Sequence, residues 1–306
     1  MIILGCGYVG TALARAALQR GEAVSALTRS ESRAAELRAL GLARVVTGDI
    51  AGEEWHQALN TAGESIVNSV APSARGVEGY RHSFIAGTKS LIRWLEQSAA
   101  AGHEPARELV FTSSTGVYPQ TDGGWVAEDA PAGNAELSPA GAILREAENL
   151  LLALPPRLVR RVWVLRLAGL YGPGRHHLLD ALRTGEKTFP GGGEYWVNLL
   201  HRADAVGAIN ACLNAPALVP GGVYNVADDE PVRKRDLVVW LAERLGMDAA
   251  ALMFDATISA RSGHRKNASG QIPDRRIANA HFKNALGWSC LYRSYGIGYD
   301  EIIRQS

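Results

Sequence analysis

Short apolar runs alternate with longer amphipathic segments along the first half of the chain. The apolar runs are rich in Val, Ile and Leu, which is typical of buried strands, and Gly or Pro ends most of the segments between them. This pattern predicts strands at residues 1–4, 22–28, 43–47, 65–70, 107–113 and 161–167. It predicts helices at 11–20, 30–40, from 53, at 79–101 and at 137–154.

Repeated strand–helix units predict an α/β fold, a doubly wound parallel sheet with helices on both faces. With a glycine-rich turn after the first strand, the expected strand order is 3-2-1-4-5-6, that of the Rossmann fold. After residue 167 Gly and Pro cluster and the elements shorten; helices are predicted at 176–185, 203–214 and 233–246, strands near 195–200 and 223–227, and a loop at 256–274. We therefore predict a Rossmann domain at 1–167 and a smaller C-terminal substrate lobe at 168–306, with room for the chain to return to the sheet.

The first strand leads directly into a glycine-rich turn and a helix. Gly5, Gly7 and Gly10 have the G-x-G-x-x-G spacing of a dinucleotide-binding turn. Gly5 would form the tight turn, Gly7 would let a pyrophosphate approach the backbone, and Gly10 would let helix and strand pack closely. Tyr8 and Val9 lie within this turn, and the helix after it would face the phosphates with its free N–H groups and positive dipole end. The sequence therefore predicts a dinucleotide site at this turn.

The end of the second strand indicates which dinucleotide binds. Folds that prefer NAD place an acidic residue there, but this chain has Arg29 and Ser30, with Arg33 one turn later. A guanidinium group pairs with a phosphate through a bidentate fork, so we predict NADP, with NAD as the alternative. The competing explanation is that the arginines form a solvated helix start. Asp49 and Ile50, after the third strand, would contact the adenine edge, unless Asp49 simply caps the next turn.

Composition and charge narrow the class of protein. The 306-residue chain has a formal net charge of +1, so no basic field would draw it to nucleic acid or to an acidic membrane. Cys6, Cys212 and Cys290 are far apart and odd in number, which argues against a disulfide framework or a zinc site. No segment reaches the ~18 apolar residues of a membrane span. We therefore expect a cytoplasmic protein with a small-molecule substrate and without metal, nucleic acid or membrane partners.

Further short motifs follow the glycine turn along the chain. They are Gly87-Thr88 with Leu91, Thr112–Pro119 (T-S-S-T-G-V-Y-P), Arg166–Gly174 (R-L-A-G-L-Y-G-P-G), Val197–Asp204 (V-N-L-L-H-R-A-D) and Tyr224–Val226 (Y-N-V). In this order they resemble the motifs of the extended short-chain dehydrogenase/reductases, the NAD(P)-dependent epimerases and dehydratases of nucleotide sugars. The resemblance covers nearly the whole chain. It implies cofactor contacts by Ser69, Val70 and Ala71 after the fourth strand, and by Thr112 and Arg145.

The catalytic pair of that family has no counterpart in this sequence. The family uses a Tyr that exchanges a proton with the reacting oxygen, and a Lys four residues later that lowers the Tyr pKa and holds the nicotinamide ribose. In the best alignment Gly141 takes the Tyr position and Arg145 the Lys position, which resembles an atypical branch without the pair. Arg145 can donate to ribose hydroxyls but stays protonated. Thr115 keeps the family's Ser/Thr position, and Tyr118 is the nearest phenol, so Thr115, Tyr118 and Arg145 are the catalytic candidates. Packing against the sheet edge is the alternative for Tyr118.

Five residues are candidates for substrate contacts. Arg166 and Tyr171 belong to the motif of the sixth strand, His176 to the glycine-rich loop after it, and Asn198 and Arg276 to later segments that resemble the family. Arg276 can pair with a diphosphate, with simple surface exposure as the alternative. His176 has no carboxylate or Cys at ligand spacing, which favours a solvated loop over a metal site.

Two functions fit these patterns. The first is an NADP(H)-dependent oxidoreductase or epimerase, acting on a sugar nucleotide or another small carbonyl compound with non-standard acid/base residues. The second is a catalytically silent NADP(H)-binding sensor or regulatory protein, which the missing pair favours. Trp125, in a glycine-rich loop, would close over a pocket or merely cover a helix. The apolar stripe Phe84, Leu91 and Leu95 and the run Leu150–Leu152 suggest a homodimer through helices 79–101 and 137–154.

Overall fold

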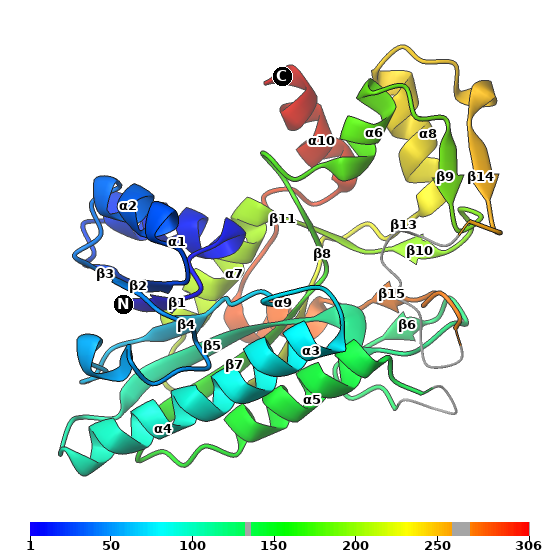
Figure 1. The fold of residues 1–306 in the computed structure, drawn as a ribbon. Helices are drawn as coiled ribbons and strands as arrows, with labels where there is room; N and C mark the ends of the chain where they lie inside the picture. The colour runs from blue at the N-terminus through cyan, green and yellow to red at the C-terminus, as the bar shows by residue number, and fades with distance from the viewer. Residues whose placement is uncertain (132–135, 259–269, 306) are drawn as a thin grey trace. The chain divides into compact units, whose positions relative to one another are not determined.

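The fold is described from a computed structural model, which covers residues 1–131, 136–258 and 270–305. Its central sheet has seven strands: β1 (Ile2–Leu4), β2 (Ser25–Thr28), β3 (Arg44–Thr47), β4 (Ile66–Asn68), β5 (Ala106–Ser114), β7 (Val159–Leu167) and β12 (Gly222–Val226). They lie in the order β3-β2-β1-β4-β5-β7-β12 (Figure 1). β1 pairs in parallel with β2 and β4, β2 pairs in parallel with β3, and β4 with β5. The predicted order 3-2-1-4-5-6 is therefore confirmed, and a seventh strand extends the sheet.

Helices cover both faces of this sheet, which is why its strands carry apolar side chains without alternation. The helices are α1 (Tyr8–Gln19), α2 (Glu31–Ala39), α4 (Gly87–Ala100), α5 (Pro139–Leu152) and α7 (Arg202–Leu213). In Figure 1, α4 and α5 lie on one face and α1, α2 and α7 on the other. β1 and β4 are buried throughout. The predicted doubly wound α/β fold is confirmed.

The segment predicted as one helix at 79–101 is composite. It begins with α3 (Val77–Tyr80), continues as a π-helical turn at Arg81–Ala86, and only then becomes α4. The helix predicted from residue 53 is a short 3₁₀ turn, η1 (His56–Ala58). Both differences concern the type of helix, 3₁₀ or π instead of α. The spacing of apolar positions in the sequence does not distinguish these types over a few residues.

The apolar stripe on this helix faces the protein's own interior. Phe84, Leu91 and Leu95 are all buried, and the Phe84 ring lies 6.2 Å from that of Phe111 on β5. The outward positions Lys89 and Arg93 are exposed and charged. The stripe is therefore used for packing on the sheet and does not support the predicted homodimer. Of the run Leu150–Leu152, Leu151 is buried and Leu152 is exposed, and the homodimer stays a prediction.

The chain divides into two compact units, which we call the sheet unit and the second unit. The sheet unit comprises residues 1–114, 142–166 and 206–224, and the second unit comprises 115–141, 167–205 and 225–306. A single division at residue 167 is therefore too simple. The physical reason is that the chain returns to the sheet unit after residue 205. There β12 adds a strand to the sheet, and most of α7 belongs to the same unit.

The second unit is built from pairs of short strands and small helices. The pairs are β6 (Trp125–Val126) with β15 (Arg276–Ile277), β8 (Gly169–Tyr171) with β11 (Leu199–His201), β9 (Thr188–Pro190) with β14 (Met253–Asp255), and β10 (Trp196–Val197) with β13 (Val232–Arg233). The helices are α6 (His177–Arg183), α8 (Lys234–Arg244), α9 (Ala280–Leu286) and α10 (Tyr295–Arg304), with 3₁₀ turns η3 (Thr115–Val117) and η4 (Ala249–Ala251). Leu179, Leu237 and Leu241 pack with Tyr171 and Tyr299 in its core. Much of the loop predicted at 256–274 lies outside the described residues.

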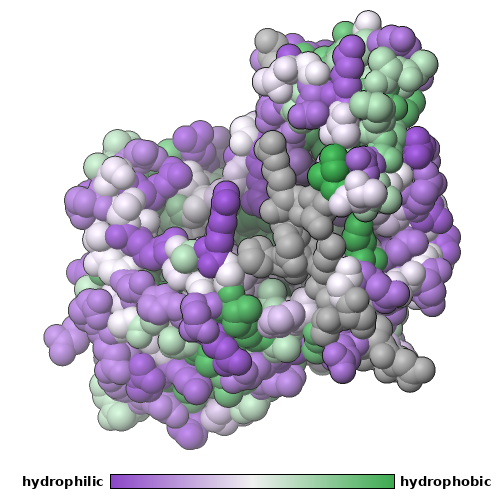
Figure 2. All heavy atoms as spheres, turned by 45° about the vertical axis from the view of Figure 1, so that its right-hand side comes forward, coloured by the Kyte–Doolittle hydropathy of each residue, from purple (hydrophilic) through white to green (hydrophobic). Residues whose placement is uncertain are grey.

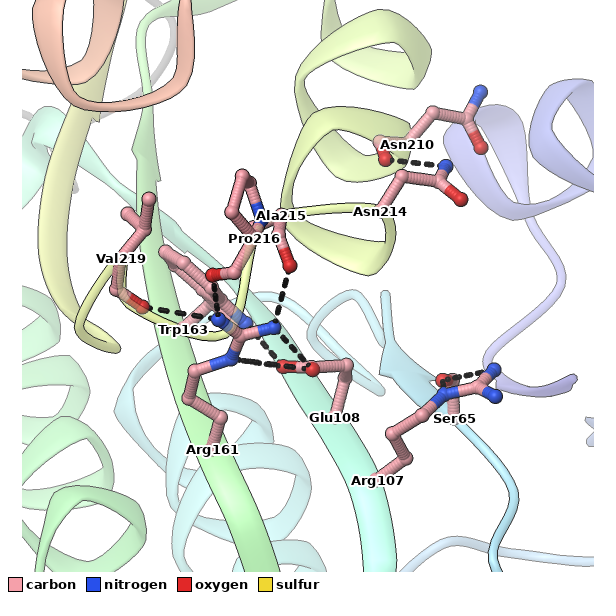
Figure 3. A network of polar contacts seen from close by, with 10 residues as sticks. All are labelled: Ser65, Arg107, Glu108, Arg161, Trp163, Asn210, Asn214, Ala215, Pro216 and Val219. Atoms are coloured by element: carbon pink, nitrogen blue, oxygen red, sulfur yellow. Dashed lines mark hydrogen bonds and ion pairs between the residues drawn. The ribbon is translucent and has the colours of Figure 1, made fainter.

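A buried polar network attaches the seventh strand to the sheet (Figure 3). Arg161 on β7 donates through Nε and Nη2 to the carboxylate of Glu108 on β5, with distances from 2.6 to 3.1 Å. Its guanidinium also donates to three carbonyls in the segment 215–219, which joins α7 to β12. The indole of Trp163 donates to the same carboxylate at 2.6 Å. One ion pair therefore fixes the path of the chain into the added strand.

The features expected from composition, which are membrane spans, cysteines and metal ligands, can be compared with the structure. Within the described ranges, no helix is long and apolar enough to cross a membrane. Hydrophilic side chains cover most of the face shown in Figure 2, and hydrophobic ones form small patches on it. Cys6, Cys212 and Cys290 are free and buried. Among the residues placed in the structure, no three His, Cys, Asp or Glu side chains are grouped to hold a metal ion.

Candidate dinucleotide site and substrate-side residues

The three glycines of the first turn stand in three different environments. Gly5 has φ +80°, and a Cβ there would lie 2.6 Å from the Cα of Val70. A Cβ at Gly10 would lie 2.8 Å from the Ser69 hydroxyl and 2.9 Å from the Gly5 carbonyl. At Gly7, by contrast, a Cβ would meet nothing within 4 Å. Gly5 and Gly10 are thus required by contacts inside the chain, whereas Gly7 leaves open space next to the backbone.

That open space lies at the N-terminus of α1. Gly7 is the N-cap residue, and no side chain of the described part caps the helix. The twelve-residue helix therefore presents free N–H groups and its positive dipole end at the place where Gly7 leaves room. This is the arrangement that a pyrophosphate needs, so the residues fit a bound dinucleotide.

At the end of β2, Arg29 and Arg33 differ in their partners. The Arg29 guanidinium donates to the Ser73 carbonyl at 3.2 Å, and no carboxylate of the described part forms an ion pair with it. Arg33 is paired with Glu36 at 2.5 Å, one turn along α2. Ser30 caps α2, as predicted, by accepting from the Arg33 N–H at 3.3 Å. Of these two arginines, Arg29 is therefore the one whose positive charge no described carboxylate offsets, which leaves it able to pair with a phosphate. The contact of Arg29 with Ser73 had no signal in the sequence, because it joins two distant loops.

Asp49 is occupied by contacts of its own. Its Oδ1 accepts from the Ala51 N–H at 2.9 Å, and its Oδ2 lies 3.0 Å from Nε2 of His82. Burial acts to raise the pKa of Asp49, but the hydrogen bonds from Ala51 and His82 and the charges of His82 and Arg29 outweigh it, so the pKa is lowered. The carboxylate thus caps a turn, which was the alternative explanation. Ile50 is buried, where it packs beside α4.

The other predicted cofactor residues gather at the carboxyl ends of the central strands. Ser69 follows β4, and its hydroxyl donates to the Gly5 carbonyl at 2.9 Å. Val70 packs against Gly5, and Ala71 comes next and is exposed. Thr112, on β5, donates to the Asn68 carbonyl at 3.3 Å. Ser69 and Val70, which follow the neighbouring strand β4, therefore support the glycine turn.

The start of α5 packs closely on η3 at the position where the resemblance expects a Tyr. A Cβ at Gly141 would lie 2.9 Å from the Gly116 carbonyl oxygen and 3.1 Å from Oγ of Ser138. Any larger side chain would force the backbone to shift. Thr115, the residue before Gly116, is buried. Its backbone carbonyl accepts a hydrogen bond from the Arg275 guanidinium at 2.7 Å.

Tyr118 and Arg145 differ in their availability. Tyr118 is 2% exposed, and its hydroxyl donates to Oδ1 of Asn225 at 2.7 Å. This buried contact fits the packing alternative for Tyr118. Arg145 is partly exposed, and no described group forms a hydrogen bond or an ion pair with it. Of the two, only Arg145 has its polar atoms available to a ligand.

Arg166 does not lie where a substrate residue was expected. It is 3% exposed and donates through Nη2 to Glu148 at 2.7 Å, while Ser113 donates to the same carboxylate at 2.6 Å. Glu148 is itself 1% exposed. This buried ion pair joins β7 to α5, because a charge in the interior needs a partner of opposite sign. The geometry of Arg166 thus favours a structural role over the predicted contact with substrate.

Three other substrate candidates are also held inside the second unit. Tyr171 is buried with its ring 4.8 Å from that of Tyr299, and burial raises its pKa. Asn198 donates to the Arg275 carbonyl at 2.9 Å and accepts from the Ile277 N–H at 2.7 Å, so both ends of its amide bind backbone. His176 forms a 2.8 Å contact with Asp180. For Tyr171 and Asn198 the geometry indicates packing roles, which motifs alone could not distinguish from substrate contacts.

Comparison with known proteins identifies the family of this chain. Residues 1–227 match the NAD dependent epimerase/dehydratase family. The chain belongs to that family. Protein YeeZ of Escherichia coli (strain K12) is 32% identical over 251 residues, which is 80% of this chain and 84% of the relative. The 3-diazoavenalumate denitrifying reductase of a Streptomyces species is 29% identical over 95% of this chain and 96% of its own length.

Solved structures share the fold of this family member. DesIV from Streptomyces venezuelae, a dTDP-glucose 4,6-dehydratase solved with NAD bound, has a TM-score of 0.77 and 21% sequence identity, covering 99% of this chain and 96% of its own. The family is one of NAD(P)-dependent enzymes, and the glycine turn of this member keeps the open face that such a cofactor needs.

Proposed function

We propose that this chain is an NADP(H)-dependent oxidoreductase or epimerase of a sugar nucleotide or another small carbonyl compound, working with non-standard acid/base residues. The observation that carries the proposal is the open space at Gly7 in front of the uncapped α1, combined with Arg29 at the end of β2. When bound, the dinucleotide supplies or accepts a hydride. The remaining tasks fall to the side chains of this chain.

Separate residues would hold the two phosphate groups of the cofactor, which are the pyrophosphate bridge and the 2′-phosphate of the adenosine ribose. The N–H groups of the first turn of α1 would bind the pyrophosphate. Arg29 would pair with the 2′-phosphate, because its guanidinium has only a carbonyl partner, and the Ser30 hydroxyl stands beside it in the sequence. Arg145 would donate to ribose hydroxyls, but its permanent charge bars it from acting as a base. Thr115 would donate a hydrogen bond to the substrate oxygen.

The cofactor proposal is tested by replacing, one at a time, Arg29, which has no carboxylate partner among the described residues, and Arg33, which is paired with Glu36. Arg29→Ala should raise the Kd for NADPH about 10- to 150-fold, because a hydrogen bond to a charged group contributes about 1.5–3 kcal/mol, and should leave the Kd for NADH nearly unchanged. Arg33→Ala is the matched control, because Glu36 already neutralises Arg33, and a smaller effect is expected. Equal losses for NADPH and NADH in Arg29→Ala would refute the 2′-phosphate role.

The sensor function has one specific observation in its favour. The Gly116 carbonyl stands 2.9 Å from where a Cβ of residue 141 would be, so the position expected for the catalytic Tyr is closed by backbone. Titration with NADP and NADPH, followed by a panel of carbonyl compounds and nucleotide sugars, separates the two functions. Turnover of any member supports the enzyme. Strong discrimination between the two redox forms without turnover supports the sensor.

We also propose that the protein works in the cytoplasm and forms a homodimer through the helices at 79–101 and 137–154. Three free cysteines support a reducing compartment. The partly exposed Ile92 and Leu150 and the exposed Leu152 are apolar side chains of these helices that a partner could cover. A monomer in sedimentation equilibrium at micromolar concentration would remove the dimer.

A further inference from the structure

A path of hydrogen bonds links Arg29 to the helical segment that follows β4. The Arg29 guanidinium donates through Nη1 to the backbone carbonyl of Ser73 at 3.2 Å. The N–H of the same Ser73 donates to the hydroxyl of Ser83 at 2.8 Å. Ser83 is 3% exposed and belongs to the π-helical turn Arg81–Ala86. All three residues lie in the sheet unit, and we call this path the Arg29–Ser83 path.

The loop at Ser73 is held on its other sides as well. Pro72 precedes Ser73, and its ring restricts the backbone at the start of the loop. The Ser73 hydroxyl donates to the Gly79 carbonyl at 3.3 Å. A Cβ at Gly79 would overlap the backbone of Ala74, so the loop packs directly on α3. The Ser73 carbonyl therefore has a defined position before any ligand binds.

Ser83 connects this loop to the interior of the sheet unit. Its neighbours Phe84 and Ile85 are buried, and the Phe84 ring packs near that of Phe111 on β5. The turn that carries Ser83 is thus anchored on the sheet. Turns with π-helical winding are rare and are frequent at functional sites. The buried hydroxyl of Ser83 therefore ties Ser73, which is only partly buried, to a fixed element.

The contact with Ser73 restricts Arg29 without neutralising it. Arg29 is exposed, and a long side chain at such a position otherwise samples many rotamers. One of its five N–H donors binds the Ser73 carbonyl, which carries no net charge. A side chain that is ordered before the ligand arrives does not lose that freedom on binding, and this favours affinity.

We propose that Ser83 is a positioning residue for cofactor selectivity: through Ser73 it holds Arg29 in place for the 2′-phosphate of NADP(H). The inference rests on the proposed function, in which Arg29 binds that phosphate. It assigns part of the selectivity to a buried side chain on a different element. NADH has no 2′-phosphate, so its affinity should not depend on the Arg29–Ser83 path.

Calorimetric titration with NADPH and with NADH tests the inference. Ser83→Ala should raise the Kd for NADPH about 2- to 13-fold, which corresponds to ordering one long side chain on binding, and should leave the Kd for NADH nearly unchanged. The ratio of the two Kd values is the decisive readout, because a general loss of structure weakens both cofactors. Ser90→Ala is the matched control: Ser90 is equally buried on α4, but its hydroxyl donates to the Gly52 carbonyl. It should leave the ratio unchanged.

A double variant tests whether Ser83 acts through Arg29. In the Arg29→Ala background, Ser83→Ala should have no further effect on the ratio. The inference is overturned by an unchanged ratio in Ser83→Ala, by an equal change in Ser90→Ala, or by a full effect of Ser83→Ala without Arg29. If Ser83→Ala does not fold, Ser73→Gly decides instead: it frees the loop backbone and should reduce the NADPH preference. An unchanged ratio in that variant would overturn the inference equally.

Two further readouts separate this inference from the proposed function. Equal losses for NADPH and NADH in Arg29→Ala refute the 2′-phosphate role itself. A selective loss in Arg29→Ala, together with an unchanged ratio in Ser83→Ala, refutes only the positioning by Ser83. Amide exchange in the cofactor-free protein reports the contact directly: the Ser73 N–H should exchange faster in Ser83→Ala and at the original rate in Ser90→Ala.

Discussion

Replacement of Arg161 by Met should destabilise the sheet unit, because it leaves the Glu108 carboxylate without a countercharge. The two side chains are only 16% and 5% exposed. Removal of one partner of a buried ion pair costs about 3–5 kcal/mol. Arg161 retains some exposure, so water can reach the carboxylate, and Trp163 still donates to it at 2.6 Å. We therefore expect the lower end, ~3 kcal/mol.

Equilibrium unfolding in urea measures this loss. With a slope of about 1–3 kcal/mol per molar urea, the midpoint should fall by about 1 M or more. The adjacent Arg160→Met is the matched control, because Arg160 and its partner Glu104 are 60% and 71% exposed, and such surface pairs contribute about 0–1 kcal/mol. Amide exchange in the segment 215–226 should also accelerate in Arg161→Met, because that segment loses its guanidinium donor.

A double-mutant cycle separates the ion pair from simple loss of packing. Glu108→Gln combined with Arg161→Met removes both charges, so the double variant should lose less than the sum of the two single losses. The reasoning is refuted if Arg161→Met behaves like Arg160→Met, or if the single losses add without coupling.

Two further predictions concern the glycine turn and a buried histidine. Gly7→Ala should leave the urea midpoint unchanged and weaken NADPH binding, whereas Gly10→Ala should lower the midpoint, because its Cβ would lie 2.8 Å from the Ser69 hydroxyl; equal midpoints would contradict this division. Burial lowers the pKa of His201 to about 4. In the unfolded chain that pKa is ~6.5, so the unfolded state binds the proton more strongly between these values and stability falls as the pH drops through that window. His201→Asn should flatten this part of the curve of unfolding free energy against pH, and an unchanged slope would remove His201 as its cause.

The sequence by itself determined the order of the sheet and the location of the glycine turn. Both follow from local features: the alternation of strands and helices fixes a doubly wound sheet, and a G-x-G-x-x-G spacing between strand and helix defines a turn geometry. The tight turn at Gly5 and the close packing at Gly10 could also be stated in advance, but their contacts with Val70 and Ser69 could not, because those residues belong to a distant segment. Ser30 as a helix cap belongs to the same group.

Only the tertiary structure decided which polar residues are available to a ligand. Arg166 and Asn198 match motifs just as Arg276 does, yet the first pairs with Glu148 and the second binds backbone on both sides. The partners come from distant segments, and a linear pattern does not record long-range contacts. The same reason explains why the sequence could single out Trp125 and Arg276 separately but could not show that they lie against each other. They belong to β6 and β15, which are far apart in the sequence, and folding alone brings them together.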